Sequence, residues 1–250
     1  MSVNLYPVPE SIKANTHVDK AEYQRLYQWS VDDPEGFWAE QGQRIDWIKP
    51  YTRVCDSNFS SEKLDIKWFA DGQLNATYSC IDRHLEQHPQ RTAIIWEGDE
   101  PDKQKHISYQ QLHDEVCRLS NGLKDLGVEK GDRVIIYMPM IPEAAYAMLA
   151  CARVGAVHSV IFAGFSPNAI ADRIQDCGAK IVITADEGLR GGKKVEINSS
   201  FVLEAGKFRD LPCGVQAVDV ERVKLRCRPL RRRLSCRALG SADDAWSKRW

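Results

Sequence analysis

The chain has 250 residues, of which 43% are hydrophobic and 28% are charged, and its formal net charge is -1. A chain of this length predicts one large or two small globular domains that bury enough apolar surface to fold without cross-links. The near-neutral charge gives no overall electrostatic reason to expect nucleic acid or an anionic membrane as a partner.

The cysteines and the N-terminus indicate the compartment. The eight cysteines include no CxxC pair, and their spacing fits neither a zinc site nor a compact disulfide framework. Most of the first five lie in apolar-periodic stretches, as expected for reduced core thiols. The opening residues, MSVNLYPVPES, lack the basic and apolar regions of a signal peptide, and no run of about 18 apolar residues follows. The sequence therefore predicts a soluble protein of the cytoplasm.

Residues 1–90 are expected to form an N-terminal extension. Two helical stretches lie within residues 19–47, and Asp33 with Pro34 has the composition of a helix cap and first turn. Aromatic residues are dense here, which favours burial of the extension against a larger body over a role in stacking a ligand. They are Trp29, Phe37, Trp38, Trp47, Trp68 and Phe69.

From Thr92 onward, apolar strand-like runs alternate with helical patterns. Strands are expected at 92–98, 132–138, 156–162 and 179–185. A capping box of Ser108 and Gln111 opens the first intervening helix. The second helix begins at Pro142, and the third is capped by Ser166 and ends at Gly178. This β-α-β-α-β-α-β order predicts an α/β fold with a mostly parallel sheet and helices on both faces.

Ligands of such sheets bind beyond the carboxyl ends of the strands, which singles out the loops at 163–166 and 186–194. The second loop contains RGGKK at 190–194, with three cations around two glycines. Glycine permits positive φ and close backbone approach, and the planar fork of Arg190 suits phosphate oxygens. The pattern favours a phosphate-bearing ligand, although an ordinary solvated turn has the same composition.

The chain offers no recognisable catalytic motif, since GxSxG, HExxH and GxxxxGK[ST] do not occur. His84 and His88 stand four residues apart, but no third ligand is evident, so a solvated face is favoured over a metal pair. We predict neither a catalytic residue nor a metal ligand within these 250 residues.

The chain changes character near Glu196. Residues 1–195 hold 22 Lys and Arg against 28 Asp and Glu, whereas residues 196–250 hold 12 against 7. Nine of the 12 basic residues in this tail are arginines, and no clean amphipathic period is visible. Three interpretations compete: a nucleic-acid arm built on residues such as Arg226 and Arg231, an irregular subdomain, and translation in a shifted reading frame.

Four long segments of the first 195 residues closely resemble the acetyl-coenzyme A synthetases of the adenylate-forming, or AMP-binding, superfamily. They are EYQRLYQWSVDDPEGFWAE, IKWFADGQLNATYSCIDRHL, GDRVIIYMPMIPEAAYAMLACARVGAVHSVIFAGFSPNAIADRI and ITADEGLRGGKK. The resemblance implies the family's N-terminal extension at 1–90 and an incomplete AMP-binding large domain at 91–195. It also implies a ligase that joins acetate to coenzyme A through acetyl-adenylate, using ATP and magnesium.

In this family, the loop that matches Arg190, Gly191, Gly192 and Lys193 binds the nucleotide phosphates of coenzyme A, so the resemblance implies that these four residues do so here. The family loop often ends in Arg at the position of Lys193, and an ammonium pairs with phosphate without bidentate geometry. The stretch 162–164 matches a segment near coenzyme A, with Ala163 in place of the usual Gly.

The resemblance breaks off after residue 195. The family continues with a phosphate loop of the form TSGSTGKPKG, adenine- and acetate-binding segments and an adenylation lysine, none of which we find here. We therefore favour a shifted reading frame for residues 196–250 and expect them to be irregular or disordered.

The expected protein is thus a truncated acetate–coenzyme A ligase that is inactive alone and has an open sheet edge. A non-catalytic coenzyme A-binding module and a propionate-activating relative are the alternatives. We expect small-molecule substrates as partners, without a membrane or nucleic acid.

Overall fold

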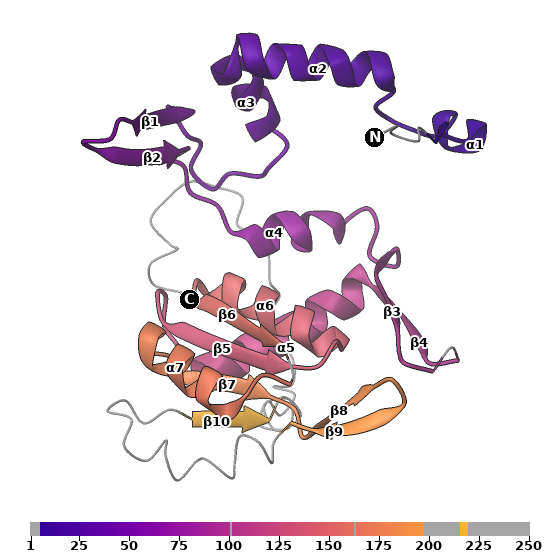
Figure 1. The fold of residues 1–250 in the computed structure, drawn as a ribbon, viewed down its shortest axis with the longest axis vertical. Coiled ribbons are helices and arrows are strands. Elements are labelled where there is room, and N and C mark those ends of the chain that lie inside the picture. Colours follow the sequence, from indigo (N-terminus) through magenta and orange to yellow (C-terminus); the bar gives the residue numbers. More distant parts are fainter. Residues whose placement is uncertain (1–5, 101, 163, 198–215, 220–250) are drawn as a thin grey trace, which may run out of the picture. The chain divides into compact units, whose positions relative to one another are not determined.

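The computed structural model describes residues 6–100, 102–162, 164–197 and 216–219. They belong to two compact units, Met1–Leu74 and Asn75–Trp250 (Figure 1). Ala163 and the arginines that suggested a nucleic-acid arm lie outside the described residues. The expected division of the chain at residues 90 and 195 stays a prediction.

The described residues of the first unit form three helices and a hairpin. The helices are α1 (Glu10–Lys13), α2 (Lys20–Asp32) and α3 (Pro34–Gly42), and the antiparallel strands are β1 (Cys55–Phe59) and β2 (Leu64–Trp68). The helices α2 and α3 confirm the two helical stretches expected between residues 19 and 47. Asp33 caps α3 by accepting a hydrogen bond from the Gly36 N–H at 3.0 Å, as its pairing with Pro34 predicted.

Aromatic contacts hold much of this unit together. The ring centroids of Tyr51 and Phe69 lie 4.6 Å apart, and Trp38 packs edge-on against Trp68 at 5.9 Å. Val54 is the one buried hydrophobic side chain among the described residues of the unit. The unit therefore buries little apolar surface of its own. Burial of this extension against a larger body stays a prediction.

The second unit is built on a four-stranded parallel sheet in the order β10–β7–β5–β6. The strands are β5 (Arg133–Met138), β6 (Val157–Phe162), β7 (Ile181–Thr184) and β10 (Gln216–Asp219). Three of them coincide with strands expected from apolar runs, which confirms the α/β class and the mostly parallel sheet. The strand β10 differs from expectation, because it lies in the tail that was expected to be irregular and it extends the sheet beyond β7.

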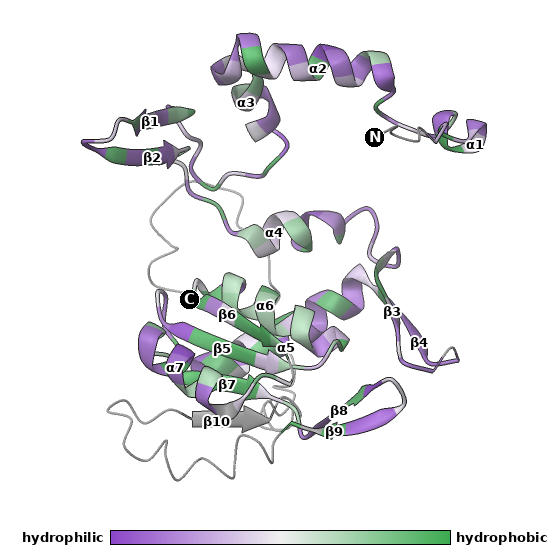
Figure 2. Ribbon diagram, viewed as in Figure 1, coloured by the Kyte–Doolittle hydropathy of each residue, from purple (hydrophilic) through white to green (hydrophobic). Residues whose placement is uncertain are grey.

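Helices cover both faces of this sheet, as predicted. The helices α5 (Tyr109–Asp125) and α6 (Pro142–Val154) pack on one face, and α7 (Pro167–Cys177) packs on the other. Alternate residues of β5 enter the two cores: Ile136 lies under α5 and α6, whereas Ile135 and Tyr137 lie under α7. Figure 2 shows that β5, β6 and β7 are hydrophobic along most of their length. The residues of β5 after Arg133 and all of β7 are buried, as expected for strands covered on both faces, whereas most of β6 is exposed.

The helix ends follow their capping signals. The Ser108 hydroxyl accepts from the Gln111 N–H at 3.2 Å, and the Gln111 side chain accepts from the Ser108 N–H at 2.9 Å, so the capping box is confirmed. Gly155 and Gly178 end α6 and α7 with φ of 76° and 58°. Within the described part of the chain, no helix combines the length and apolar character that crossing a bilayer requires.

One expected strand lies outside the main sheet. The run at 92–98 forms β3 (Thr92–Glu97), but β3 pairs antiparallel with β4 (Gln104–Ser108) in a separate two-stranded sheet. The sequence of β4, QKHIS, is mostly polar and gives a weak strand signal. The expectation that the strand at 92–98 begins the parallel sheet was therefore wrong.

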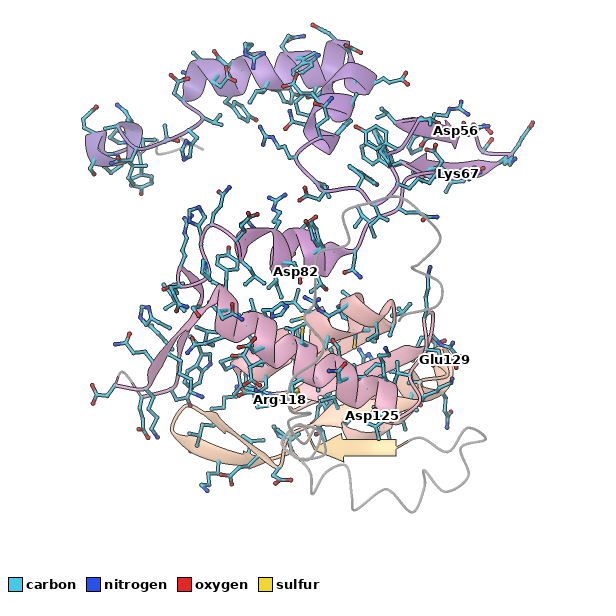
Figure 3. The ribbon with its side chains drawn as sticks, turned by 180° about the vertical axis from the view of Figure 1, so that it is seen from behind. Asp56, Lys67, Asp82, Arg118, Asp125 and Glu129 are labelled. Atoms are coloured by element: carbon cyan, nitrogen blue, oxygen red, sulfur yellow. The ribbon has the colours of Figure 1, made fainter. Side chains whose placement is uncertain are left out.

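A buried ionic network joins three elements of the second unit. Asp82, labelled in Figure 3, lies in a short 3-10 helix (Asp82–His84) that follows α4 (Ala76–Cys80). It accepts two hydrogen bonds from the Arg153 guanidinium, at 2.7 and 3.2 Å. Nε2 of His113 lies 3.5 Å from the same carboxylate. Burial raises the pKa of Asp82, but hydrogen bonds from His113 and Arg153 and the charge of Arg153 outweigh it, so the pKa lies below its usual value.

We predict that Asp82→Asn lowers the free energy of unfolding by about 3 kcal/mol at neutral pH, because Arg153 is left buried without its counter-charge. Since the folded pKa of Asp82 lies below the unfolded one, its contribution is complete above the ordinary carboxyl value of about 4 and is lost as the pH falls through the depressed value. Urea unfolding at pH 7 and at acidic pH measures both effects. The exposed Asp125→Asn is the matched control, and equal losses in the two variants would contradict the prediction.

Candidate functional site

The carboxyl ends of three parallel strands meet at one edge of the sheet. The chain leaves β5 through α6 to β6 on one side of β5, and then passes through α7 to β7 on the other side. Beyond the carboxyl ends of the strands at such a change of direction, α/β sheets generally bind their ligands. The described segments just beyond these ends are 139–141, 164–166 and 185–197.

The segment after β7 folds into a tight hairpin. Its strands are β8 (Glu187–Arg190) and β9 (Lys193–Glu196). Gly191 and Gly192 form the two-residue turn with φ of 58° and 72°, the pair of positive values that a type I′ turn requires. The sequence predicted a loop at 186–194 and the need for its glycines. The structure adds the paired strands that hold Arg190 opposite Lys193.

This hairpin carries the four residues predicted to bind phosphate and exposes their cations. The Lys194 ammonium donates to both carboxylate oxygens of Glu187, at 2.9 and 3.0 Å. Arg190 and Lys193 are exposed and form no ion pair with any residue that the structure describes. Two positive charges that form no salt bridge with a described residue therefore flank a glycine turn, which is an arrangement that favours an anionic ligand.

The loop after β6 lies next to this turn. A methyl group built on Gly164 would lie 4.0 Å from Nη1 of Arg190, and Gly164 has a φ of 105° that other residues rarely adopt. The Gly164 N–H donates to the hydroxyl of Tyr137 at 3.2 Å, and Tyr137 is only 1% exposed. The structure thus brings together the two loops that the sequence singled out, and a core tyrosine fixes one of them.

Contacts at both ends of the hairpin fix its position. At its base, a Cβ on Gly188 would approach the Cβ of Pro139 to 2.9 Å and the Cδ1 of Ile197 to 3.1 Å, so the close packing there requires glycine. At its tip, the Gly192 N–H donates to the carboxylate of Asp99 at 3.1 Å. Sequence reasoning missed Asp99, because no local pattern around it indicates a partner so far along the chain.

No group of three His, Cys, Asp or Glu side chains suited to a metal ion occurs among the described residues. The His84 ring packs against Tyr109 with centroids 4.8 Å apart, which gives this histidine a structural contact. The features that remain are cations, backbone N–H groups and glycines.

Comparison with known families identifies the class of protein. A model of AMP-binding enzymes matches residues 81–226, more than half of the chain, and the chain therefore belongs to the AMP-binding enzyme family. A second model, the acetyl-coenzyme A synthetase N-terminus, matches residues 23–80. The AMP-binding match includes β10 and continues past residue 195, where the resemblance seen in the sequence ended.

Curated relatives narrow the similarity to one kind of enzyme. The acetyl-coenzyme A synthetase of Agrobacterium fabrum is 61% identical over 200 residues, which are 80% of this chain and 31% of the relative. That of Pseudoalteromonas translucida is 58% identical over the same shares. That of Methylobacterium radiotolerans is 57% identical over 222 residues, 89% of this chain and 34% of the relative. The resemblance to acetyl-coenzyme A synthetases is confirmed, and the chain spans about a third of the length of these relatives.

We predict that Gly191→Val and Gly192→Val each destabilise the hairpin by about 1–2 kcal/mol, because a side chain with a Cβ is strained at positive φ. Gly191→Asn should lose much less, since asparagine tolerates this conformation. Amide hydrogen exchange of residues 187–196 measures the change, with the core amide of Ile135 as an internal reference. Equal exchange in the valine and asparagine variants would argue against the type I′ geometry.

Proposed function

We propose that this chain supplies the coenzyme A phosphate-binding part of an acetate–coenzyme A ligase. In the complete reaction, acetate and ATP form acetyl-adenylate and pyrophosphate, and the thiol of coenzyme A then displaces AMP to give acetyl-coenzyme A. The observation that carries the proposal is the turn at 190–193, where Arg190 and Lys193, which form no ion pair with any described residue, flank two glycines beside the loop that contains Gly164. Relatives that are 58% and 61% identical to this chain over 200 residues are named acetyl-coenzyme A synthetase.

The chemistry of the turn suits nucleotide phosphates. The Arg190 guanidinium can donate two parallel hydrogen bonds to one phosphate, and the Lys193 ammonium adds a point charge from the paired position across the hairpin. The glycines remove side chains that would keep a phosphate away from the backbone. In this proposal Arg190, Gly191, Gly192 and Lys193 bind and orient the nucleotide end of coenzyme A, and none of them reacts.

We propose further that these 250 residues alone do not form acetyl-adenylate. Adenylation requires a cradle for the triphosphate and neutralisation of its charge in the transition state. The sequence contains no Ser/Thr/Gly-rich phosphate loop, and no cluster suited to magnesium occurs among the described residues. The ATP and magnesium used by the family would therefore depend on residues other than these. A cytoplasmic location is part of the same proposal.

Titration calorimetry tests the coenzyme A site. We predict weak binding of coenzyme A by the unmodified chain, and a loss of about tenfold for Arg190→Ala and for Lys193→Ala, because each substitution removes a charge-assisted hydrogen bond. Lys194→Ala is the matched control, since Lys194 is already paired with Glu187. Pantetheine, which lacks the nucleotide phosphates, should give no signal. If coenzyme A at millimolar concentration gives no heat of binding with the unmodified chain, the proposal is wrong.

Acetate-dependent exchange between ATP and pyrophosphate tests the second part. We predict no exchange above the protein-free rate, because the triphosphate has no binding loop in these residues. Measurable exchange would overturn this prediction. Binding of coenzyme A without exchange agrees equally with a non-catalytic coenzyme A-binding module. Exchange with propionate but not with acetate would transfer the assignment to a propionate-activating relative.

A further inference from the structure

We infer that Asp99 is a positioning residue for the turn at 190–193. Its carboxylate accepts a hydrogen bond from the Gly192 N–H at 3.1 Å and thereby ties hairpin β3–β4 to the tip of hairpin β8–β9, across 93 positions of sequence. The functional meaning of this contact rests on the proposed binding of coenzyme A phosphates by the turn. The contact itself is a property of the hairpins and is testable without a ligand.

The turn needs an external restraint. Gly191 and Gly192 lose more conformational freedom on ordering than any other residue type would. The strands β8 and β9 have four residues each, and an isolated two-stranded hairpin is marginally stable in water. In a two-residue hairpin turn the N–H of the second turn residue lies outside the strand ladder, so it is available to an acceptor from another segment. Asp99 supplies that acceptor.

The segment that carries Asp99 is itself held in place. Nε1 of Trp96 donates to the carbonyl oxygen of Met140 at 2.7 Å, which attaches hairpin β3–β4 to the segment beyond β5. Next to Asp99, the Gly98 N–H donates to the carbonyl oxygen of Lys103 at 2.7 Å and closes the turn of this hairpin. The segment after β5 therefore holds the hairpin that carries Asp99, and Asp99 holds the turn at 190–193.

The carboxylate of Asp99 acts on the turn in two opposite ways. As a charged acceptor it forms a stronger hydrogen bond with the Gly192 N–H than a neutral oxygen would. As a negative charge beside Arg190 and Lys193 it opposes the approach of an anionic ligand. Asparagine separates these effects, because it keeps an acceptor oxygen and removes the charge, whereas alanine removes both.

The test combines amide exchange with ligand binding on the 250-residue chain. In Asp99→Ala we expect the Gly192 amide to exchange at least threefold faster and the affinity for coenzyme A to fall by about two- to tenfold, as for the loss of one hydrogen bond. Asp99→Asn should restore slow exchange and bind coenzyme A at least as well as the unmodified chain. Asp102→Ala removes the same charge from the same turn and should change neither quantity.

The outcomes separate this inference from the proposed function. Unchanged Gly192 exchange in Asp99→Ala would overturn the positioning role. Coenzyme A affinity no weaker in Asp99→Ala than in Asp99→Asn would do so as well, because only the acceptor oxygen distinguishes these two variants. Equal losses in the alanine and asparagine variants would overturn it too, because the charge rather than the acceptor would then matter. If the unmodified chain binds no coenzyme A, the proposed function fails, and the Gly192 amide alone decides whether Asp99 fixes the turn. Matching thermal unfolding midpoints establish that each variant is folded.

Discussion

The second unit depends on the burial of β5 on both of its faces. Val134 and Ile136 enter the core beneath α5 and α6, and Ile135 and Tyr137 enter the core beneath α7, all at 1% exposure or less. Each such side chain contributes about 1.5–3 kcal/mol by leaving water. A strand of this kind is stable only when helices cover both of its faces. The helices α6 and α7, which connect the parallel strands, therefore also provide the cover that β5 requires.

The same strand determines where the candidate site lies. Because β6 and β7 lie on opposite sides of β5, their carboxyl ends bring the loop with Gly164 and the hairpin β8–β9 to the same edge. Tyr137 connects the core to this edge directly, since its ring lies in the core while its hydroxyl accepts the Gly164 N–H at 3.2 Å. A change in the packing of β5 would therefore displace Gly164, which lies next to Arg190.

Local sequence signals predicted the elements that local forces create. The capping box at Ser108, the left-handed glycine at 178 and the apolar run at 132–138 each act within a few residues, and the structure contains all three. Pairing between distant segments was harder to predict from the sequence. The polar strand β4 and the short strands β8 and β9 have no apolar run that would reveal them. The acceptor role of Asp99 depends on a residue 93 positions away, and no periodicity encodes such a contact.

The sequence singled out Arg190, Gly191, Gly192 and Lys193 as a candidate site by their composition, whereas the geometry of the turn came only from the structure. Under the proposed function, the nucleotide phosphates of coenzyme A lie at the opposite end of the molecule from the thiol that reacts. Contacts with a non-reacting part of a substrate aid catalysis when their binding energy orients the reacting end. Such contacts need a rigid frame more than chemical reactivity. A glycine turn can fit closely around phosphate, but on its own it is conformationally flexible. Two contacts restrain this turn: Gly188 packs on Pro139 at the base of the hairpin, and the Gly192 N–H donates to Asp99 at its tip. These restraints reduce the entropy that ligand binding would otherwise cost.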